Sequence, residues 1–426
     1  MKSFLFIYQY ELVKILRKRS TVIFLILITL ITVVLNLNTI PLYSAGRMGA
    51  AIDNPGAVLG KIPFRYIDDK GDMVEEGVSA LKYIRLQREY ALKWKGHPLD
   101  DSTIKEMQEF LNKYRGMIPA DEDYNMAYLL QNYYWVFRSI YNLGLNPWNE
   151  NLTEESLKTY MNRAWDVEYD NQELTEKEKL FWDEHEPLEY PIIIDYAPAY
   201  GMLINYAFWI HFLLIVFVII ALGESFSLEK RRNTKQVMQT TPKGFSSAVY
   251  ARFLAGETVA VSAALLLYGI SMIIQFSILG SDGYSMPLQQ LGGFSWSRLM
   301  ISSGDATLLL YGSSIIIIVS VAALTMMVSE LSQNVVVSVG VMMAVLMVTM
   351  AIDIPVFGLN RNLSQVWAYL PLQRIRHEFL YDERLVSFGN NAFPAIPFSN
   401  AVYVIVLLLS FILCVWLTVK SRRENV

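Results

Sequence analysis

The chain has 426 residues, of which 53% are hydrophobic and only 18% are charged, and its formal net charge is −4. About a quarter of the residues of a soluble protein are charged, and several apolar runs here exceed the roughly 18 residues that cross a bilayer core. The composition therefore excludes an ordinary soluble protein and predicts an all-α polytopic membrane protein. The single cysteine, Cys414, lies in the last apolar run, which excludes a disulfide framework and a cysteine-based metal site.

Residues 1–19 precede the first apolar run and predict an amphipathic elbow helix. Apolar residues recur there at helical spacing and cations flank them, which is typical of a helix that lies along the inner membrane surface. The apolar face consists of Phe4, Ile7, Tyr8, Leu12, Ile15 and Leu16. The alternative is that this segment is simply the start of a bent first span.

Six apolar runs predict six membrane spans. Their residues are 20–40, 201–222, 250–279, 305–329, 334–357 and 399–419. With six spans, the basic clusters before the first, after the second and after the last span all fall on one side. Because such clusters stay in the cytoplasm, we expect a multi-pass protein of the plasma membrane with both termini cytoplasmic. The stretch 358–398 opposes this rule, since it carries four arginines on the outer side.

The segments between the spans alternate between the two sides. Residues 41–198 contain 17 Lys and Arg against 28 Asp and Glu, so an acidic domain is inserted into a basic membrane framework. Capping-box patterns and interspersed prolines predict that it is mainly helical, with helices at about 74–94, 103–115, 122–142, 154–170 and 175–185. The full assignment is an extracytoplasmic domain at 41–200, a cytoplasmic coupling loop at 223–249, an outer loop at 280–304, an outer segment at 358–398 and a cytoplasmic tail at 420–426.

The third helix of the outer domain is unusually aromatic. Tyr128, Tyr134 and Trp135 are weak candidates for substrate binding, because Tyr and Trp suit a surface with one apolar and one wet side. The plainer interpretation of the same residues is a buried core seam.

Catalytic constellations are absent from the sequence. The four histidines show no paired metal-ligand spacing, and no nucleophile motif occurs, so we expect no catalytic residue, metal or cofactor in this chain. His211 lies inside the second span, either as a proton or ligand site or near the outer end, where it reaches the interface. Glu257 falls one or two turns into the third span, and the few charges within the spans are too few for an ion-coupled relay.

The coupling loop carries the most informative pattern in the chain. It consists of Glu229, Arg231, Arg232, Val237, Met238, Thr241, Pro242 and, at the start of the next span, Arg252. With the order of elbow helix, span, outer domain, span, charged loop and four further spans, this pattern resembles the permease subunits of the second class of ABC exporters. Their opening helix is similar to residues 10–19 here. The resemblance covers the membrane framework and not the outer domain, which is longer than the family's usual first outer loop.

The resemblance implies a motor in a separate protein. A cytoplasmic P-loop ATPase would bind ATP and Mg²⁺ and contact the coupling loop, and a second permease, identical or related, would complete the path. The expected substrate is amphiphilic or peptide-like, the other expected contact is membrane lipid, and no nucleic acid is expected. The family folds the segment that corresponds to 358–398 into re-entrant outer helices. Two rivals stay open: a sensor or immunity protein that binds an external ligand without pumping, and an integral membrane enzyme.

Overall fold

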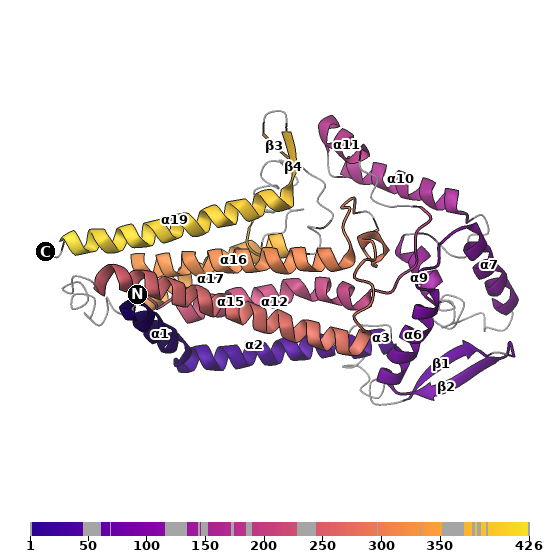
Figure 1. The fold of residues 1–426 in the computed structure, drawn as a ribbon, viewed down its shortest axis with the longest axis horizontal. Helices are drawn as coiled ribbons and strands as arrows, with labels where there is room; N and C mark the ends of the chain where they lie inside the picture. Colours follow the sequence, from indigo (N-terminus) through magenta and orange to yellow (C-terminus); the bar gives the residue numbers. More distant parts are fainter. Residues whose placement is uncertain are drawn as a thin grey trace.

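The structure, a computed structural model, is an elongated bundle of long helices with a smaller domain at one end (Figure 1). Both chain termini lie at the opposite end, which we call the terminal end; the other is the domain end. The structure describes residues 2–45, 61–68, 70–115, 134–143, 145, 152–171, 174–184, 190–227, 244–295, 297–332, 334–351, 370–376, 380, 385–388 and 391–424.

Long apolar helices build the bundle. Five stretches of helix are long and apolar enough to cross a membrane, namely residues 19–42, 198–222, 248–279, 303–331 and 396–420. The chain is therefore a mostly helical, multi-pass membrane protein. The helices are α2 (Arg19–Leu37), α3 (Thr39–Ala45), α12 (Pro198–Leu222), α15 (Gly244–Leu279), α16 (Ser303–Leu331), α17 (Val335–Ala351) and α19 (Ala395–Glu424).

The predicted spans need adjustment at their ends. α15 begins at Gly244 and not at residue 250, and α19 begins at Ala395 and not at residue 399, because both helices continue beyond their apolar cores. The predicted span 334–357 corresponds to α17, whose 17 residues reach about 25 Å, short of the roughly 30 Å of a bilayer core. Residues 352–357 of that span lie outside the described residues.

α12 and α16 form the centre of the bundle. In each of them, 61% of the most apolar 18-residue stretch is buried inside the protein, whereas the buried share is 22% in the first span and in α19. Leu214, Phe217, Ile317 and Ala322 belong to this central core, all with 1% exposure or less. The outward faces of α2 and α19 are apolar and exposed, as membrane-facing helices require.

A separate helix precedes the first span. α1 (Lys2–Leu16) ends before Arg17 and Lys18, and it packs along α15 at the terminal end (Figure 1). The segment is therefore not simply the start of a bent first span. The predicted apolar face is correct except for Leu16, which is 43% exposed.

The smaller domain contains helices and a β-hairpin. The predicted helix at 74–94 begins only at residue 80, because residues 73–78 pair with 62–67 as antiparallel strands, Phe64 opposite Glu76. A turn closes this hairpin, in which Asp68 accepts hydrogen bonds from the amides of Lys70 and Asp72, both at 2.9 Å. The elements are β1 (Ile62–Ile67), β2 (Met73–Val78), α6 (Ala80–Trp94), α7 (Asp101–Arg115), α9 (Tyr134–Asn142), α10 (Glu154–Asn171) and α11 (Glu176–Asp183).

The domain rests on the connection between α15 and α16. Arg88 pairs with Asp282 at 2.7 Å, and the amide of Asn142 donates to the carbonyl oxygen of Gln290 in η2 (Leu288–Gln290) at 2.7 Å. Glu178 of α11 accepts a hydrogen bond from the amide of Leu385 at 2.9 Å. The domain is thus fixed to two connections at the domain end of the bundle.

The connection between α17 and α19 is described only in part, and residues 358–369 of the predicted re-entrant segment lie outside the described residues. Its described part contains η4 (Gln373–Ile375), a short 3₁₀ turn, and the antiparallel strands β3 (Leu385–Phe388) and β4 (Asn391–Pro394). The turn lies deep in the bundle, where Arg374 donates to Ser399 Oγ at 2.5 Å and Gln373 to the carbonyl oxygen of Thr349 at 2.7 Å. These bonds satisfy the polar side chains of a short turn that enters the bundle.

Candidate functional site

The candidate site is the terminal end of the bundle, where the chain leaves α12 and returns as α15. α12 ends at Leu222, the described chain continues to Ser227, and α15 begins at Gly244. The residues predicted for ATPase coupling in the loop all lie outside the described residues: Glu229, Arg231, Arg232, Val237, Met238, Thr241 and Pro242. What the structure describes is how the two ends of the loop 228–243 are held.

A buried ion pair fastens α1 to the start of α15. Glu11 accepts from Arg252 Nη2 at 3.0 Å and from Lys14 Nζ at 3.1 Å, and the side chains of Glu11 and Arg252 are each only 5% exposed. Burial raises the pKa of Glu11, but Arg252 and Lys14 outweigh it, so that the pKa lies below its ordinary value and the carboxylate is ionised at neutral pH. The sequence analysis included Arg252 in the coupling pattern but did not predict a role for Glu11. A single acid on the apolar face of the predicted helix was the feature that could have indicated one.

A second ion pair fixes the break between α1 and α2 to the end of α12. Lys18 Nζ lies 2.7 Å from Glu224 Oε1 and donates to the carbonyl oxygen of Ala221 at 3.4 Å. Burial lowers the pKa of Lys18, and the neighbouring carboxylate of Glu224 offsets this only in part. The first residues of the loop connection are therefore held by the start of the first span.

The last turn of α16 holds the backbone that follows α12. Ser329 Oγ accepts from the amides of Phe226 and Ser227, both at 3.1 Å. The guanidinium of Arg252 lies 4.8 Å from the centre of the Phe226 ring, a cation–π contact. Arg252 therefore links α1, α15 and the end of α12, and four helices meet around the two ends of the loop.

This arrangement suits the transmission of movement. The polar groups around the loop ends hold helix to helix, and among the described residues no group of three or more His, Cys, Asp or Glu side chains is placed to hold a metal ion. A displacement of the loop 228–243 would act on α12 and α15 directly, and on α1 and α16 through Arg252 and Ser329.

A second polar cluster, in the middle of the bundle, surrounds His211. Its Nδ1 lies 2.5 Å from Ser314 Oγ, and its Nε2 lies 3.0 Å from the carbonyl oxygen of Pro371. Because a carbonyl only accepts, Nε2 carries the proton and Nδ1 accepts from the Ser314 hydroxyl, which in turn accepts from Tyr268. His211 is fully buried, so the alternative that it reaches the interface is wrong. The cluster ties α12, α15 and α16 to the connection before α19.

The aromatic candidates of the smaller domain are not brought together in the described part of the chain. Tyr128 lies outside the described residues, and Tyr134 and Trp135 belong to α9 but their side chains are not described. Of the other aromatic residues of α9, Phe137 is fully buried in the domain core and Tyr141 is 61% exposed. The described part of α9 therefore contributes one of these aromatic side chains to the core and one to the surface.

In comparisons with protein-family models, with characterised proteins and with solved structures, no match to the chain was found.

Proposed function

We propose that this chain is the membrane-spanning permease subunit of an ATP-driven exporter of the second ABC class. It works with a second permease, identical or related, and with two cytoplasmic P-loop ATPase subunits that bind ATP and Mg²⁺. The observation that carries the proposal is the attachment of α1 to α15, the helix that follows the loop 228–243, through Glu11 and Arg252 at 3.0 Å. A loop whose ends are held in this way transmits movement to the bundle, because its ends cannot move unless the attached helices move as well.

The path of the chain supports six crossings. Both termini lie at the terminal end of the bundle (Figure 1), and a chain that starts and ends on one side of a membrane crosses it an even number of times. Five helices meet the length and composition expected of a span, and we infer that α17 is the sixth crossing. With six crossings, the basic clusters favour a cytoplasmic terminal end.

The translocation path in this proposal runs between the two permeases. It is lined mainly by the first, second and fifth spans, which correspond to α2, α12 and α17. α2 and α17 expose large apolar side chains, among them Val34 at 67% and Val336 at 76%. Such surfaces fit contact with lipid, with a second permease and with an amphiphilic or peptide-like substrate.

The first test is purification of the full chain from native membranes in a mild detergent. We expect a P-loop ATPase to co-elute in stoichiometric amount and the preparation to hydrolyse ATP. A permease that elutes without an ATPase would refute the proposal and favour the rival function, a sensor or immunity protein whose outer domain binds a ligand without pumping.

The second test addresses the loop itself. Glu229→Ala should insert and fold normally but lose ATP-dependent transport, because this residue belongs to the loop that contacts the motor. Glu109→Ala is the matched control, since Glu109 is a highly exposed acid on α7 at the domain end. Unchanged transport in Glu229→Ala would contradict the coupling role.

A further inference from the structure

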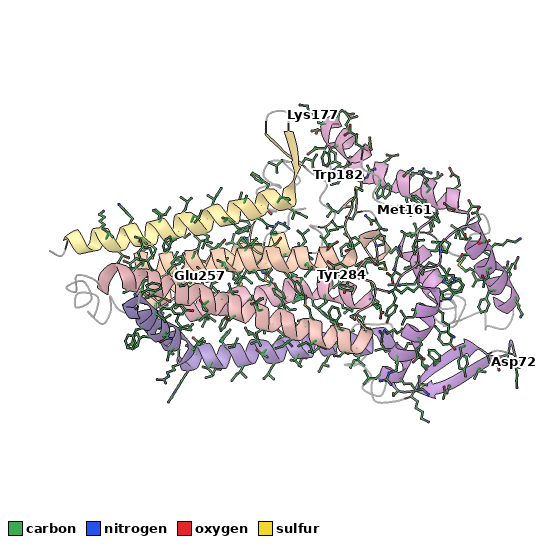
Figure 2. The ribbon with its side chains drawn as sticks, in the orientation of Figure 1. Asp72, Met161, Lys177, Trp182, Glu257 and Tyr284 are labelled. Atoms are coloured by element: carbon green, nitrogen blue, oxygen red, sulfur yellow. The ribbon has the colours of Figure 1, made fainter. Side chains whose placement is uncertain are left out.

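Glu257 is a half-buried acid within the apolar part of α15. It lies inside the stretch 248–279 that is apolar enough to cross a membrane (Figure 2). Both of its carboxyl oxygens are buried, and among the residues that the structure describes neither has a hydrogen-bond partner. Glu11, by contrast, is paired with two cations, so the described part of the bundle contains a buried acid with charged partners as well as Glu257.

An unpartnered carboxylate in such surroundings is costly. Hydrocarbon and apolar side chains do not solvate the negative charge, and acids within membrane spans are accordingly rare and face a partner, a cavity or a pathway. Glu257 must therefore be neutral at rest, with a bound proton, or be balanced by a cation from outside the described chain.

The nearest cation in the sequence does not supply this balance. Arg252 precedes Glu257 by five residues, which places the two side chains about 140° apart around the helix axis. Arg252 also points to Glu11, at 3.0 Å, and to the ring of Phe226. Another cation, Lys420 of α19, lies 5.4 Å from the centre of the Trp416 ring and thus contacts that ring.

Glu257 faces the seam between α15 and α19. It follows Phe253 by one helical turn and therefore shares its face. Phe253 packs on Phe411 of α19 with ring centres 4.7 Å apart, and Tyr250 contacts the same ring at 5.5 Å. Exposed leucines border this region, among them Leu254 and Leu408. The acid thus lies beside an apolar surface that is open to the bilayer.

We propose that Glu257 binds the cationic group of an amphiphile that enters from the bilayer between α15 and α19. The carboxyl group releases its proton to water as the cation arrives, and a carboxylate–cation pair replaces the neutral acid, so that charge is conserved. The apolar part of the ligand contacts the aromatic side chains of the seam. This inference narrows the substrate class of the proposed exporter and rests on that function, but the binding step needs no ATPase and is measured on the permease alone.

The first experiment treats the full chain, purified in lipid nanodiscs, with dicyclohexylcarbodiimide, which modifies protonated carboxyl groups in apolar surroundings. Mass spectrometry should locate the adduct on Glu257 and not on Glu11, which is ion-paired. Tetraphenylphosphonium should suppress the modification, whereas tetraphenylborate, an anion of the same shape, should not. An unmodified Glu257 would overturn the proposal, and so would equal protection by the two ions.

The second experiment measures the binding of radiolabelled tetraphenylphosphonium to the same preparation by equilibrium dialysis. Glu257→Gln keeps the shape of the side chain and should weaken binding about tenfold or more, because a desolvated charge pair is lost. Glu257→Asp, which keeps the carboxyl group, should retain binding. Unaltered affinity in Glu257→Gln would refute the site. If the permease binds the cation but co-purifies with no ATPase, the proposed site at Glu257 is supported and the proposed exporter function is refuted.

Discussion

Single residues at the terminal end decide whether α1 remains attached to the bundle. Glu11 and Arg252 come from positions 241 apart in the chain, and their side chains are almost fully buried. A buried ion pair adds little stability relative to an apolar pair of the same shape, but the removal of one partner leaves the other charge uncompensated. The pair therefore fixes the position of α1 along α15.

Glu11→Gln tests this role. The substitution should lower the free energy of unfolding by about 3–5 kcal/mol at neutral pH, because Arg252 stays buried without its counter-charge. Thermal unfolding in detergent measures the loss. The double variant Glu11→Leu/Arg252→Met, which removes both charges, should recover most of it. If the double variant were as unstable as the single one, the loss would come from packing and not from charge.

The pH dependence of the same pair follows from the pKa of Glu11. This pKa is depressed in the folded protein, so the contribution of the carboxylate is fully present above the ordinary value of 4.5 and is lost as the pH falls through the folded value. The stability difference between the natural chain and Glu11→Gln should therefore be constant between pH 7 and pH 5 and shrink below about pH 4.5. A difference that stays constant on further acidification would contradict the assigned ionisation.

His211 is the residue on which the middle of the bundle depends. His211→Ala leaves the Ser314 hydroxyl and the Pro371 carbonyl without their partner and should cost about 1–3 kcal/mol. Trp209→Phe is the matched control, since Trp209 is 47% exposed on the same helix, and it should change stability by less than about 0.5 kcal/mol. Unfolding of both variants in the same detergent provides the comparison, and equal stabilities would show that the His211 cluster is dispensable.

At the scale of elements, α11 and the hairpin β3–β4 behave as one unit. Glu178 accepts from the amide and the hydroxyl of Thr175 at the start of α11, both at 2.8 Å, and also from the amide of Leu385 at 2.9 Å. Leu385 and Trp182 are buried in one small cluster. One carboxylate thus caps a helix of the domain and joins it to the connection before α19.

Glu178→Ala should release the hairpin from α11. We expect faster hydrogen exchange in the peptide that covers residues 385–394, by about five- to tenfold, since the lost bonds to a charged group correspond to roughly 1–1.5 kcal/mol of local stability. Glu176→Ala is the control, because Glu176 lies in the same first turn but is 87% exposed in a loose pair with Lys179. Equal exchange in the two variants would show that the hairpin is held by other contacts.

The elements that the sequence predicted are those with a strong local signal. Apolar runs predicted five membrane-length helices within a few residues, and the capping box at Thr175 and Glu178 is present at the start of α11. The hairpin β1–β2 was missed because residues 74–78 were joined to the helical pattern that follows, although Gly71, with a φ of 84°, and the aspartates around it favour a turn. The pairs of Glu11 with Arg252 and of His211 with Ser314 were not predictable, since no local pattern relates residues so far apart.

At the scale of the whole molecule, polar contacts gather at two ends, to which the proposed function assigns different tasks. Arg252, Glu224 and Ser329 gather the helix ends at the terminal end, and ion pairs such as Arg88–Asp282 fix the domain at the other. The central helices α12 and α16 run between the two ends. In the proposed function, a movement imposed at the loop would reach the domain through these buried helices, and this function requires that the two ends lie on opposite sides of one membrane.

Cysteine labelling in intact cells tests that condition. In a Cys414→Ser background, which leaves no native thiol, Glu109→Cys on α7 should react with a membrane-impermeant maleimide from outside. Asn334→Cys, in the turn between α16 and α17, and Lys420→Cys, near the end of α19, should react only after permeabilisation. Because α17 is shorter than the other spans, position 420 is decisive: if α17 did not cross, α19 would deliver this residue to the outside. External labelling of Lys420→Cys would therefore show that the chain crosses the membrane five times and that its two termini lie on opposite sides. In that case the loop 228–243 and the C-terminal tail could not contact the same cytoplasmic partner.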